Sequence, residues 1–365
     1  MMDSDHISDL TVAAFEVPTD FPESDGTLKW DSTTIVTVEI SAMGKNGLGF
    51  TYANAATALY LDKKLKQVVV GKHPFSIQAI FNDMLTAVRN DGQCGLAMMA
   101  ISAVDIALWD LKAKLFNLPL CSLLGQLRQQ AKVYGSGGFT SYTDAQLQEQ
   151  LGNWAAEGFR AVKMKIGREP QRDLERVRKA RGAIGEKTDL FIDANGAFSA
   201  RQAVEQAALF QQYSVGWFEE AVSSQDLQGL QFVRQHTPPD MRIAAGEYGY
   251  TTDDFMRMLE HGSVDVLQAD ATRCGGITGF LKAGQLCNAY HMPFSFHCSP
   301  AAHLHPALCT DTFYIGEYFH DHVRIEKILF DGLPQVEKGF LVPDLSAPGL
   351  GLNFKMQDAD PYRIS

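Results

Sequence analysis

The chain has 365 residues, of which 45% are hydrophobic and 21% charged, and its formal net charge is −11. This length exceeds what one core usually fills, so we expect a large domain and a smaller one. The acidic net charge argues against a nucleic-acid partner or an anionic membrane surface. The chain contains no run of 18 apolar residues, so no membrane span is predicted. The six cysteines form no CxxC pair and the first nine residues are mostly acidic or polar, so we expect reduced thiols in a cytoplasmic protein.

The first 130 residues mix strand and helix patterns and are predicted to form an α+β capping domain. Residues 33–40 are β-branched and nearly alternating, which predicts a strand. Helices are predicted at 55–70, 76–89 and 96–115, and the last is apolar almost all round, as a buried helix is. We expect Asp105 and Asp110 within it to be structural.

Two stretches of this region contain Gly or Pro and are predicted to be mobile loops over the active site. They are residues 17–29 and the segment around 49–52. We expect such loops to set substrate specificity.

From residue 131 onward, short β-rich runs alternate with amphipathic stretches. Strands are predicted at 132–135, 161–166, 189–193, 216–219, 242–246, 265–268, 293–296 and 313–316, with helices at 144–156, 171–184 and 200–213. The alternation predicts βαβ units, and eight strands favour an α/β fold of the (β/α)₈ barrel type over residues 131–330. A doubly wound sheet is the rival, but no strand–GxGxxG–helix motif supports it. Residues 331–365 break the alternation and are predicted to pack back on the capping domain.

Each predicted strand from the second onward ends in, or carries near its end, a residue able to do chemistry. The set is Lys163 and Lys165, then Asp193, Glu219, Glu247, Asp270, His297 and Glu317. From Lys165 onward its members are 20 to 28 residues apart, which is one βα unit each. Because the carboxyl ends of barrel strands meet at one mouth, we expect these side chains to converge. The simpler alternative is that these are surface charges. Such charges would be scattered over helices and would not recur at the ends of apolar strands.

Asp193, Glu219 and Glu247 are predicted to bind a divalent metal. Three carboxylates facing one centre repel each other unless a cation lies between them. Oxygen ligands favour Mg²⁺, and we expect one ion per subunit. Zinc is less favoured because no Cys or His joins the trio.

Acid and base groups are predicted on either side of this trio. Lys163 and Lys165 lie two residues apart, so a strand places both on one face. Beside a metal and each other they should have depressed pKa values, which would suit a base. Asp270 would orient His297 and raise its basicity.

Together these residues resemble the enolase superfamily and, within it, the mandelate racemase subgroup, over nearly the whole chain. The matching motifs are Lys163-x-Lys165, Asp193-Ala-Asn195, Trp217-Phe218-Glu219-Glu220, Gly246-Glu247, Gln268-Ala-Asp270 with Gly275-Gly276-Ile277, Phe296-His297 and Gly316-Glu317. Ala221 replaces the usual proline, and Tyr248 and Tyr250 follow Glu247. His297 argues against the muconate cycloisomerase subgroup, which has a lysine there.

The resemblance implies a modified TIM barrel whose capping domain the C-terminal tail completes. It implies Mg²⁺ on the carboxylate trio, Lys165 as one acid/base group and the His297–Asp270 dyad on the opposite face. Lys163 and Glu317 would contact the substrate carboxylate. The chemistry implied is removal of the proton α to a carboxylate, giving an enediolate, in a symmetric homo-oligomer.

We expect this chemistry to dehydrate a sugar acid, an aldonate or aldarate, to a 2-keto-3-deoxy acid. A racemase or epimerase of a 2-hydroxy acid is the runner-up. Further substrate contacts are expected from Asn195, Asp20, Phe21, Tyr52, Tyr248 and His320. Acidic residues near position 20 favour a polyhydroxylated substrate over an aromatic one, because carboxylates bind hydroxyls. A non-catalytic binding protein is disfavoured because no ligand or base is missing, and a Schiff-base lyase remains a third alternative.

Two further features are predicted to lie outside the chemistry. The pairs His303/His305 and His320/His322 lack a third ligand nearby in sequence, so we expect no second metal site from them. Cys298 should point away from His297 if the strand continues, because successive strand side chains alternate.

Overall fold

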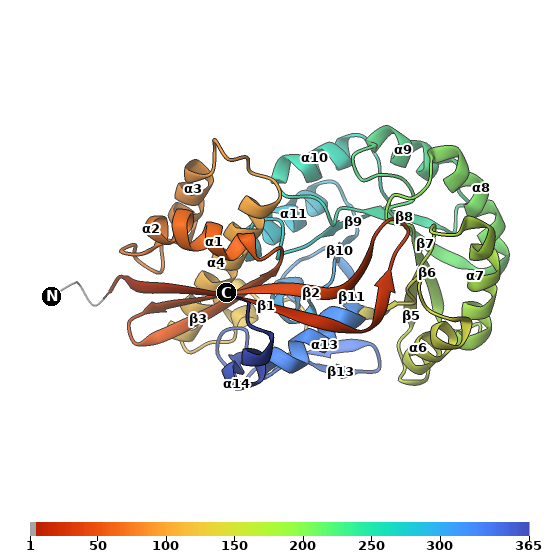
Figure 1. Cartoon of the computed structure of the whole chain (residues 1–365). Helices are drawn as coiled ribbons and strands as arrows, with labels where there is room; N and C mark the ends of the chain where they lie inside the picture. Colours follow the sequence, from red (N-terminus) through yellow and green to blue (C-terminus); the bar gives the residue numbers. More distant parts are fainter. Residues whose placement is uncertain (1–4, 365) are drawn as a thin grey trace.

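A three-stranded antiparallel sheet begins the chain in the computed structural model, which describes residues 5–364. Its strands are β1 (Ile7–Ser24), β2 (Lys29–Ala42) and β3 (Lys45–Tyr52). The long β1–β2 hairpin reaches from the cap helices across to the barrel, where Thr140 N donates a 2.8 Å hydrogen bond to Ser24 O (Figure 1). The mobile loop predicted over residues 17–29 is therefore wrong. Residues 17–24 belong to β1, which continues through a register shift between Pro18 and Glu23, and residues 25–28 form the turn.

Glycines in β3 serve close packing. A Cβ on Gly47 would lie 2.2 Å from the carbonyl oxygen of Ala107, and one on Gly49 would lie 2.0 Å from that of Ala103. The strand thus lies directly on the long helix α4 (Leu96–Leu115). The prediction of a mobile loop around residues 49–52 is wrong, because these glycines permit contact between backbones rather than movement.

The remaining cap segments are helical and lie beside this sheet. They are α1 (Ala56–Tyr60), the π-helical turn η1 (Leu61–Leu65), α2 (Lys66–Val69), α3 (Ile77–Ala87), α4 and α5 (Leu120–Leu124). As predicted, α4 is buried and its aspartates are structural. Asp105 accepts hydrogen bonds from N and Oγ1 of Thr278, and Asp110 accepts from the backbone of Leu48 and Leu350. These bonds join the cap to the barrel and to the tail.

Within the described residues, eight parallel strands close into a barrel. They are β4 (Ala131–Gly137), β5 (Ala161–Lys165), β6 (Asp189–Asp193), β7 (Val215–Glu219), β8 (Arg242–Ala245), β9 (Val266–Ala269), β10 (Phe294–Phe296) and β11 (Phe313–Phe319). Each pairs with the next, and β11 pairs back with β4 from Gly316↔Val133 to Phe319↔Ser136. The predicted (β/α)₈ barrel is confirmed.

The helices between these strands form the outer ring seen in Figure 1. They are α6 (Asp144–Ala156), α7 (Pro170–Ile184), α8 (Ala200–Phe210) with the 3₁₀ turn η2 (Gln211–Tyr213), α9 (Leu227–His236), α10 (Thr252–Glu260), α11 (Gly276–Ala289), α12 (Pro300–Ala307) and α13 (His320–Leu329). Capping boxes at Thr143, Ser199 and Thr251 fix where three of them begin.

Apolar side chains fill the barrel below the strand ends. This layer consists of Tyr134, Ala161, Phe191, Trp217, Ala244, Val266 and Ile315. Since it occupies the interior, the polar side chains at the carboxyl ends of the strands are left above it, at the mouth.

The tail contacts both the barrel and the cap. It comprises β12 (Phe330–Asp331), β13 (Gln335–Glu337), β14 (Phe340–Val342), β15 (Asn353–Phe354), α14 (Met356–Ala359) and η3 (Asp360–Tyr362). Strand β14 pairs with β4 on the barrel, and the Ile364 amide donates to Ala14 O on β1 at 2.9 Å. None of the helices in residues 5–364 has the length and apolar character needed to traverse a bilayer.

Candidate active site

Three buried carboxylates meet at the mouth of the barrel. Asp193 ends β6, Glu219 ends β7, and Glu247 follows β8 by two residues. One carboxylate oxygen from each lies within 4.8 Å of the others. The strand register explains this, because Asp193 pairs directly with Glu219 across the ladder.

Several contacts of the trio suit it to hold a cation. Glu219 Oε2 accepts hydrogen bonds of 2.9 Å from Trp217 Nε1 and Gln268 Nε2, which fix its direction. Burial and the neighbouring carboxylates raise the pKa of Glu219 to about 8, against the opposing effect of Lys163. Glu247 Oε2 is buried without a hydrogen-bond partner. Oxygen ligands in an orphaned, carboxylate-rich centre suit Mg²⁺, so the residues present fit the expected ion.

Lys163 and Lys165 lie on one side of the trio. Lys163 Nζ is 2.9 Å from Glu317 Oε1 and also contacts Glu219, and Lys165 Nζ is 2.5 Å from Asp193 Oδ2. Burial lowers the pKa of each lysine, but the carboxylates around them outweigh it, so both pKa values are raised. This direction is opposite to the expected depression. That expectation counted the charge of a divalent cation, whereas the protein groups alone shift the pKa of both lysines upward.

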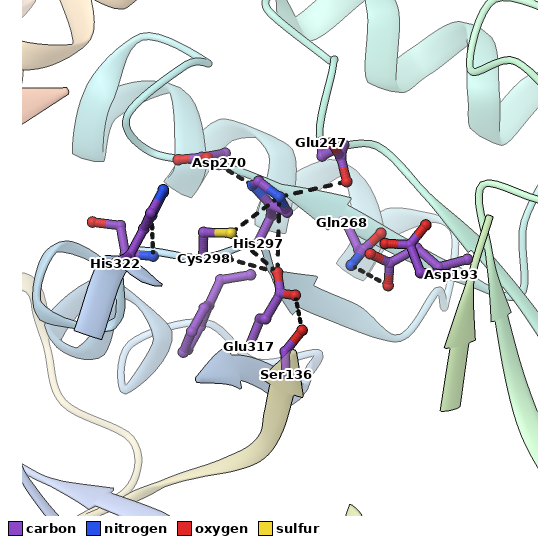
Figure 2. Close-up of polar contacts among 12 residues, drawn as sticks. Ser136, Asp193, Glu247, Gln268, Asp270, His297, Cys298, Glu317 and His322 are labelled. Atoms are coloured by element: carbon purple, nitrogen blue, oxygen red, sulfur yellow. Dashed lines mark hydrogen bonds and ion pairs between the residues drawn. The ribbon is translucent and has the colours of Figure 1, made fainter. Parts of the chain in front are cut away.

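His297 and Asp270 form a hydrogen-bonded dyad. His297 Nδ1 lies 2.8 Å from Asp270 Oδ2, and Asp270 Oδ1 accepts from N and Oγ1 of Thr272 at 2.7 Å each. The other ring nitrogen, Nε2, lies 3.4 Å from Glu247 Oε2 (Figure 2). Burial lowers the pKa of His297, but Glu247 and Asp270 outweigh it and the net direction is upward.

Glu317 and Cys298 complete the ring of polar contacts. Glu317 Oε1 accepts from Ser136 Oγ at 2.6 Å, and Oε2 accepts from the Cys298 amide at 2.9 Å. The prediction that Cys298 points away is wrong. Strand β10 stops at Phe296, and Cys298 has a left-handed backbone with φ +50°, which turns its thiol to within 3.2 Å of His297 Nε2 (Figure 2).

A cavity of about 500 Å³ opens over these groups, between the cap and the barrel. Its barrel side includes Lys165, Asn195, Glu247, Tyr248, Arg273, His297 and Cys298, and its cap side includes Asp25, Trp30, Thr33, Tyr52 and Asn54. Both expected acid/base groups, Lys165 and His297, therefore line the same cavity. Lys163, Asp193, Glu219 and Glu317 lie behind this wall and are fully buried.

The expected substrate-contacting residues divide into two groups. Asn195, Tyr52 and Tyr248 line the cavity. Asp20, Phe21 and His320 do not; they line a separate depression of about 400 Å³ beside α6. Sequence position alone placed all six near the mouth, but the register shift of β1 between Pro18 and Glu23 carries Asp20 and Phe21 outward.

Ser136 and Arg273 are among the polar residues of the site that sequence reasoning missed. Ser136 lies near the end of the first barrel strand, so the rule that found the other strand-end groups could have found it too. Arg273 lies three residues after Asp270; it donates to the backbone oxygen of Glu247 at 3.3 Å, and its guanidinium lies 5.1 Å from the Tyr248 ring centre.

The histidines of α12 have structural partners. His303 Nε2 accepts a 2.6 Å hydrogen bond from the Ala271 amide, and His305 Nδ1 accepts one of 3.1 Å from the Cys121 amide. Within the described residues, neither His303 nor His305 belongs to a group of three ligand-type side chains.

Comparison with known families matches both parts of the chain. Residues 9–125 match the model of the mandelate racemase / muconate lactonizing enzyme N-terminal domain, and residues 146–359 match the model described as enolase C-terminal domain-like. Together these matches cover most of the cap and the barrel.

Curated relatives catalyse several reactions. A 3,6-anhydro-alpha-L-galactonate cycloisomerase from Streptomyces coelicolor is 35% identical, over 72% of this chain and 74% of its own length. An L-talarate/galactarate dehydratase from Salmonella typhimurium is 31% identical over 74% and 69%. A hydrophobic dipeptide epimerase from Enterococcus faecalis is 29% identical over 72% and 73%.

Solved structures match this chain over almost its whole length. A mandelate racemase/muconate lactonizing enzyme-like protein from Rubrobacter xylanophilus is 48% identical, with a TM-score of 0.96 over 98% of this chain and 99% of that one. The L-talarate/galactarate dehydratase from Salmonella typhimurium, liganded with Mg and L-lyxarohydroxamate, is 27% identical, with a TM-score of 0.91 over 99% and 94%.

Proposed function

Because the chain belongs to the mandelate racemase and muconate lactonizing enzyme family of the enolase superfamily, we propose that it removes the proton α to the carboxylate of a sugar acid and expels the β-hydroxyl. The product would be a 2-keto-3-deoxy acid, and the substrate an aldonate or aldarate. The observation that carries this proposal is the single cavity that Lys165 and His297 both face.

Lys165 is the proposed base. It lines the cavity, whereas Lys163 is buried behind it and contacts Glu219 and Glu317. The charge of Lys163 opposes the protonation of Lys165, which lowers the pKa of Lys165 relative to a site without it. Contacts of Lys163 and Glu317 with the substrate carboxylate are proposed from the family resemblance, since both side chains are buried behind the cavity wall.

One Mg²⁺ per subunit, on Asp193, Glu219 and Glu247, would supply positive charge opposite the oxygens of the enediolate. The chain itself supports that role through fixed ligands. Trp217 and Gln268 hold Glu219, and the Asn195 amide holds Asp193 Oδ1 at 2.8 Å. Ligands that are already oriented need no rearrangement when charge develops.

His297 is the proposed acid for the leaving hydroxyl. Asp270 fixes Nδ1, so Nε2 is the atom left to deliver a proton into the cavity. Burial alone would lower the pKa of His297, and the carboxylates of Glu247 and Asp270 reverse that direction. The ring can therefore hold a proton until the hydroxyl leaves.

The cap side of the cavity supports a polyhydroxylated substrate. Asp25, Thr33 and Asn54 offer polar groups along it. The relative from Salmonella typhimurium is named as a dehydratase of two such acids, L-talarate and galactarate. For this chain we also propose substrate contacts from Tyr52, Asn195 and Tyr248, because these residues line the cavity.

Racemisation or epimerisation is the second candidate. Two acid/base groups that face one space can take a proton from one side of a carbon and return it to the other. The epimerase relative from Enterococcus faecalis favours keeping this reaction in view. A symmetric homo-oligomer is proposed from the family resemblance alone.

The deciding experiment is ¹H NMR of a panel of aldonates, aldarates and 2-hydroxy acids with the Mg²⁺-loaded protein in D₂O. A keto product with loss of the β-hydroxyl is the expected result. Exchange at Cα without a keto product would favour the racemase. No exchange and no product across the panel would overturn both, and covalent trapping of substrate by borohydride would point to a Schiff-base lysine instead.

A further inference from the structure

Outside the active-site cavity, three ligand-type side chains meet where the cap touches the barrel. Asp20 and Glu23 lie in β1 at its register shift, and His320 is the first residue of α13. One ligand atom from each lies within 4.8 Å of the other two. His320 Nε2 is 2.9 Å from Asp20 Oδ2.

Glu23 is the unusual member of this cluster. Its side chain has no solvent exposure; Oε2 accepts a 2.8 Å hydrogen bond from Trp30 Nε1, and Oε1 has no partner. Burial and the carboxylate of Asp321 raise the pKa of Glu23 to about 9. A buried polar atom without a partner is costly, and a cation bound at Oε1 would provide that partner and offset the cost of the charged carboxylate.

The cationic side chain that acts on Glu23, Arg324, pairs with Asp321 instead. Arg324 Nη2 donates to Asp321 Oδ1 at 2.6 Å, and Thr33 Oγ1 donates to the other oxygen of Asp321 at 2.5 Å. Asp20 is about one-third exposed and His320 one-quarter, at the wall of the 400 Å³ depression beside α6. An ion therefore has both a buried ligand and an entrance from solvent.

We propose that Asp20, Glu23 and His320 bind a divalent transition-metal ion of the Zn²⁺ class, which ties the cap hairpin to the barrel. One imidazole nitrogen with two carboxylate oxygens is a ligand set that zinc accepts, and it differs from the oxygen-only trio at the barrel mouth. In a tetrahedral zinc site neighbouring ligand atoms lie about 3.4 Å apart, so the observed cluster needs only small side-chain shifts. Water from the depression would take the fourth position.

The location gives such an ion a defined consequence. It would join β1 to the first turn of α13, two residues before His322, which lines the active-site cavity. The tie would hold the hairpin over the mouth, independently of which reaction the site performs.

The test is zinc binding by the full-length protein in saturating Mg²⁺, measured by equilibrium dialysis with metal analysis. Glu23→Gln keeps the oxygen that accepts from Trp30, and His320→Gln changes a partly exposed side chain, so it serves even if the buried variant folds poorly. His261→Gln, on an exposed histidine after α10, is the matched control. Zinc that enters the trio or the Cys298 region is common to all four proteins and cancels in the comparison.

We expect the unmodified protein and the His261 variant to bind one more zinc ion than the other two variants, or to bind it at least about tenfold more tightly. X-ray absorption of that ion should contain one imidazole nitrogen. Equal zinc stoichiometry and affinity in all four proteins would overturn the proposal, as would an equal loss in the His261 control.

Discussion

The Sγ atom of Cys298 lies 3.2 Å from Nε2 of His297, the ring nitrogen that Asp270 does not engage. A thiol is a weak hydrogen-bonding group, so it leaves this nitrogen free to exchange a proton with a substrate. A serine hydroxyl at the same place would bind the nitrogen more strongly and compete with the substrate.

Cys298→Ser should therefore lower kcat about fivefold, the equivalent of about 1 kcal/mol for one added hydrogen bond. Cys298→Ala should stay close to the unmodified rate. Steady-state kinetics on the best acid from the NMR panel measures this, with the buried Cys287→Ser in α11 as control. Equal kcat values for the Ser and Ala variants would contradict the competition.

Removal of divalent metal should abolish turnover, because the carboxylate trio then lacks its counter-charge. Activity should vanish with EDTA and return with Mg²⁺. Glu219→Gln should reduce kcat by at least about 100-fold and should also remove the rise in Tm that Mg²⁺ gives the unmodified protein. A Glu219 variant still stabilised by Mg²⁺ would place the ion elsewhere.

Asp270→Asn tests whether Lys165 removes the α-proton while His297 protonates the leaving hydroxyl. The amide cannot orient His297 as the carboxylate does, so formation of the keto product should fall about 100-fold. Exchange of the α-proton in D₂O should persist, since Lys165 on the other side is untouched. NMR follows both processes in one sample, and a parallel loss of exchange would show that the dyad also serves the first step.

The buried carboxyl of Asp105 should make the free energy of unfolding depend on pH. Burial raises its pKa to about 7, against the hydrogen bonds from Thr278, whereas its ordinary value is 3.8. The folded form therefore retains a proton that the unfolded form releases above about pH 4. The free energy of unfolding should fall as pH rises from about 4 to about 7, and the contribution of this carboxyl is lost above that.

Asp105→Asn should remove this slope, which amounts to as much as about 1.4 kcal/mol per pH unit. Urea unfolding at several pH values measures the difference between variant and unmodified protein. Asp240→Asn, on an exposed residue, is the control. A difference that stays constant with pH would contradict the assignment.

Gly49→Ala should destabilise the cap by about 1–3 kcal/mol, because its Cβ would meet the Ala103 carbonyl at 2.0 Å. Gly182→Ala in α7 is the matched control, since nothing lies within 4 Å of its Cβ. Replacing this exposed helical glycine with alanine should raise the free energy of unfolding by up to about 1 kcal/mol. Thermal unfolding of both variants should shift in opposite directions.

The barrel was predictable because its pattern is local. Each strand is a short apolar run, and parallel strands bring their ends to one place, so the spacing of Asp193, Glu219 and Glu247 predicted that they meet. Asp189–Asp193 is the predicted strand to the residue. The same logic could not reach the cap hairpin, where β1 continues past a register shift between Pro18 and Glu23 that no apolar alternation predicts.

The other features that the sequence did not predict depend on tertiary structure. The inward turn of Cys298 depends on a left-handed backbone two residues after β10 ends at Phe296, where the strand was predicted to end. The contact of His320 with Asp20 joins residues 300 positions apart. No window of sequence contains both, and only the docking of the hairpin on α13 brings them together.

The closure of β11 on β4 has a consequence for the order in which the molecule is made. Ser136 and Glu317, which share a hydrogen bond, are separated by 181 positions. During synthesis the carboxylate trio is complete long before Glu317 leaves the ribosome. Lys163, buried against that late carboxylate, has one of its partners only when the ring shuts. The polar centre is therefore complete only when the barrel has closed. A chain stalled before β11 would expose an open sheet edge to chaperones and proteases.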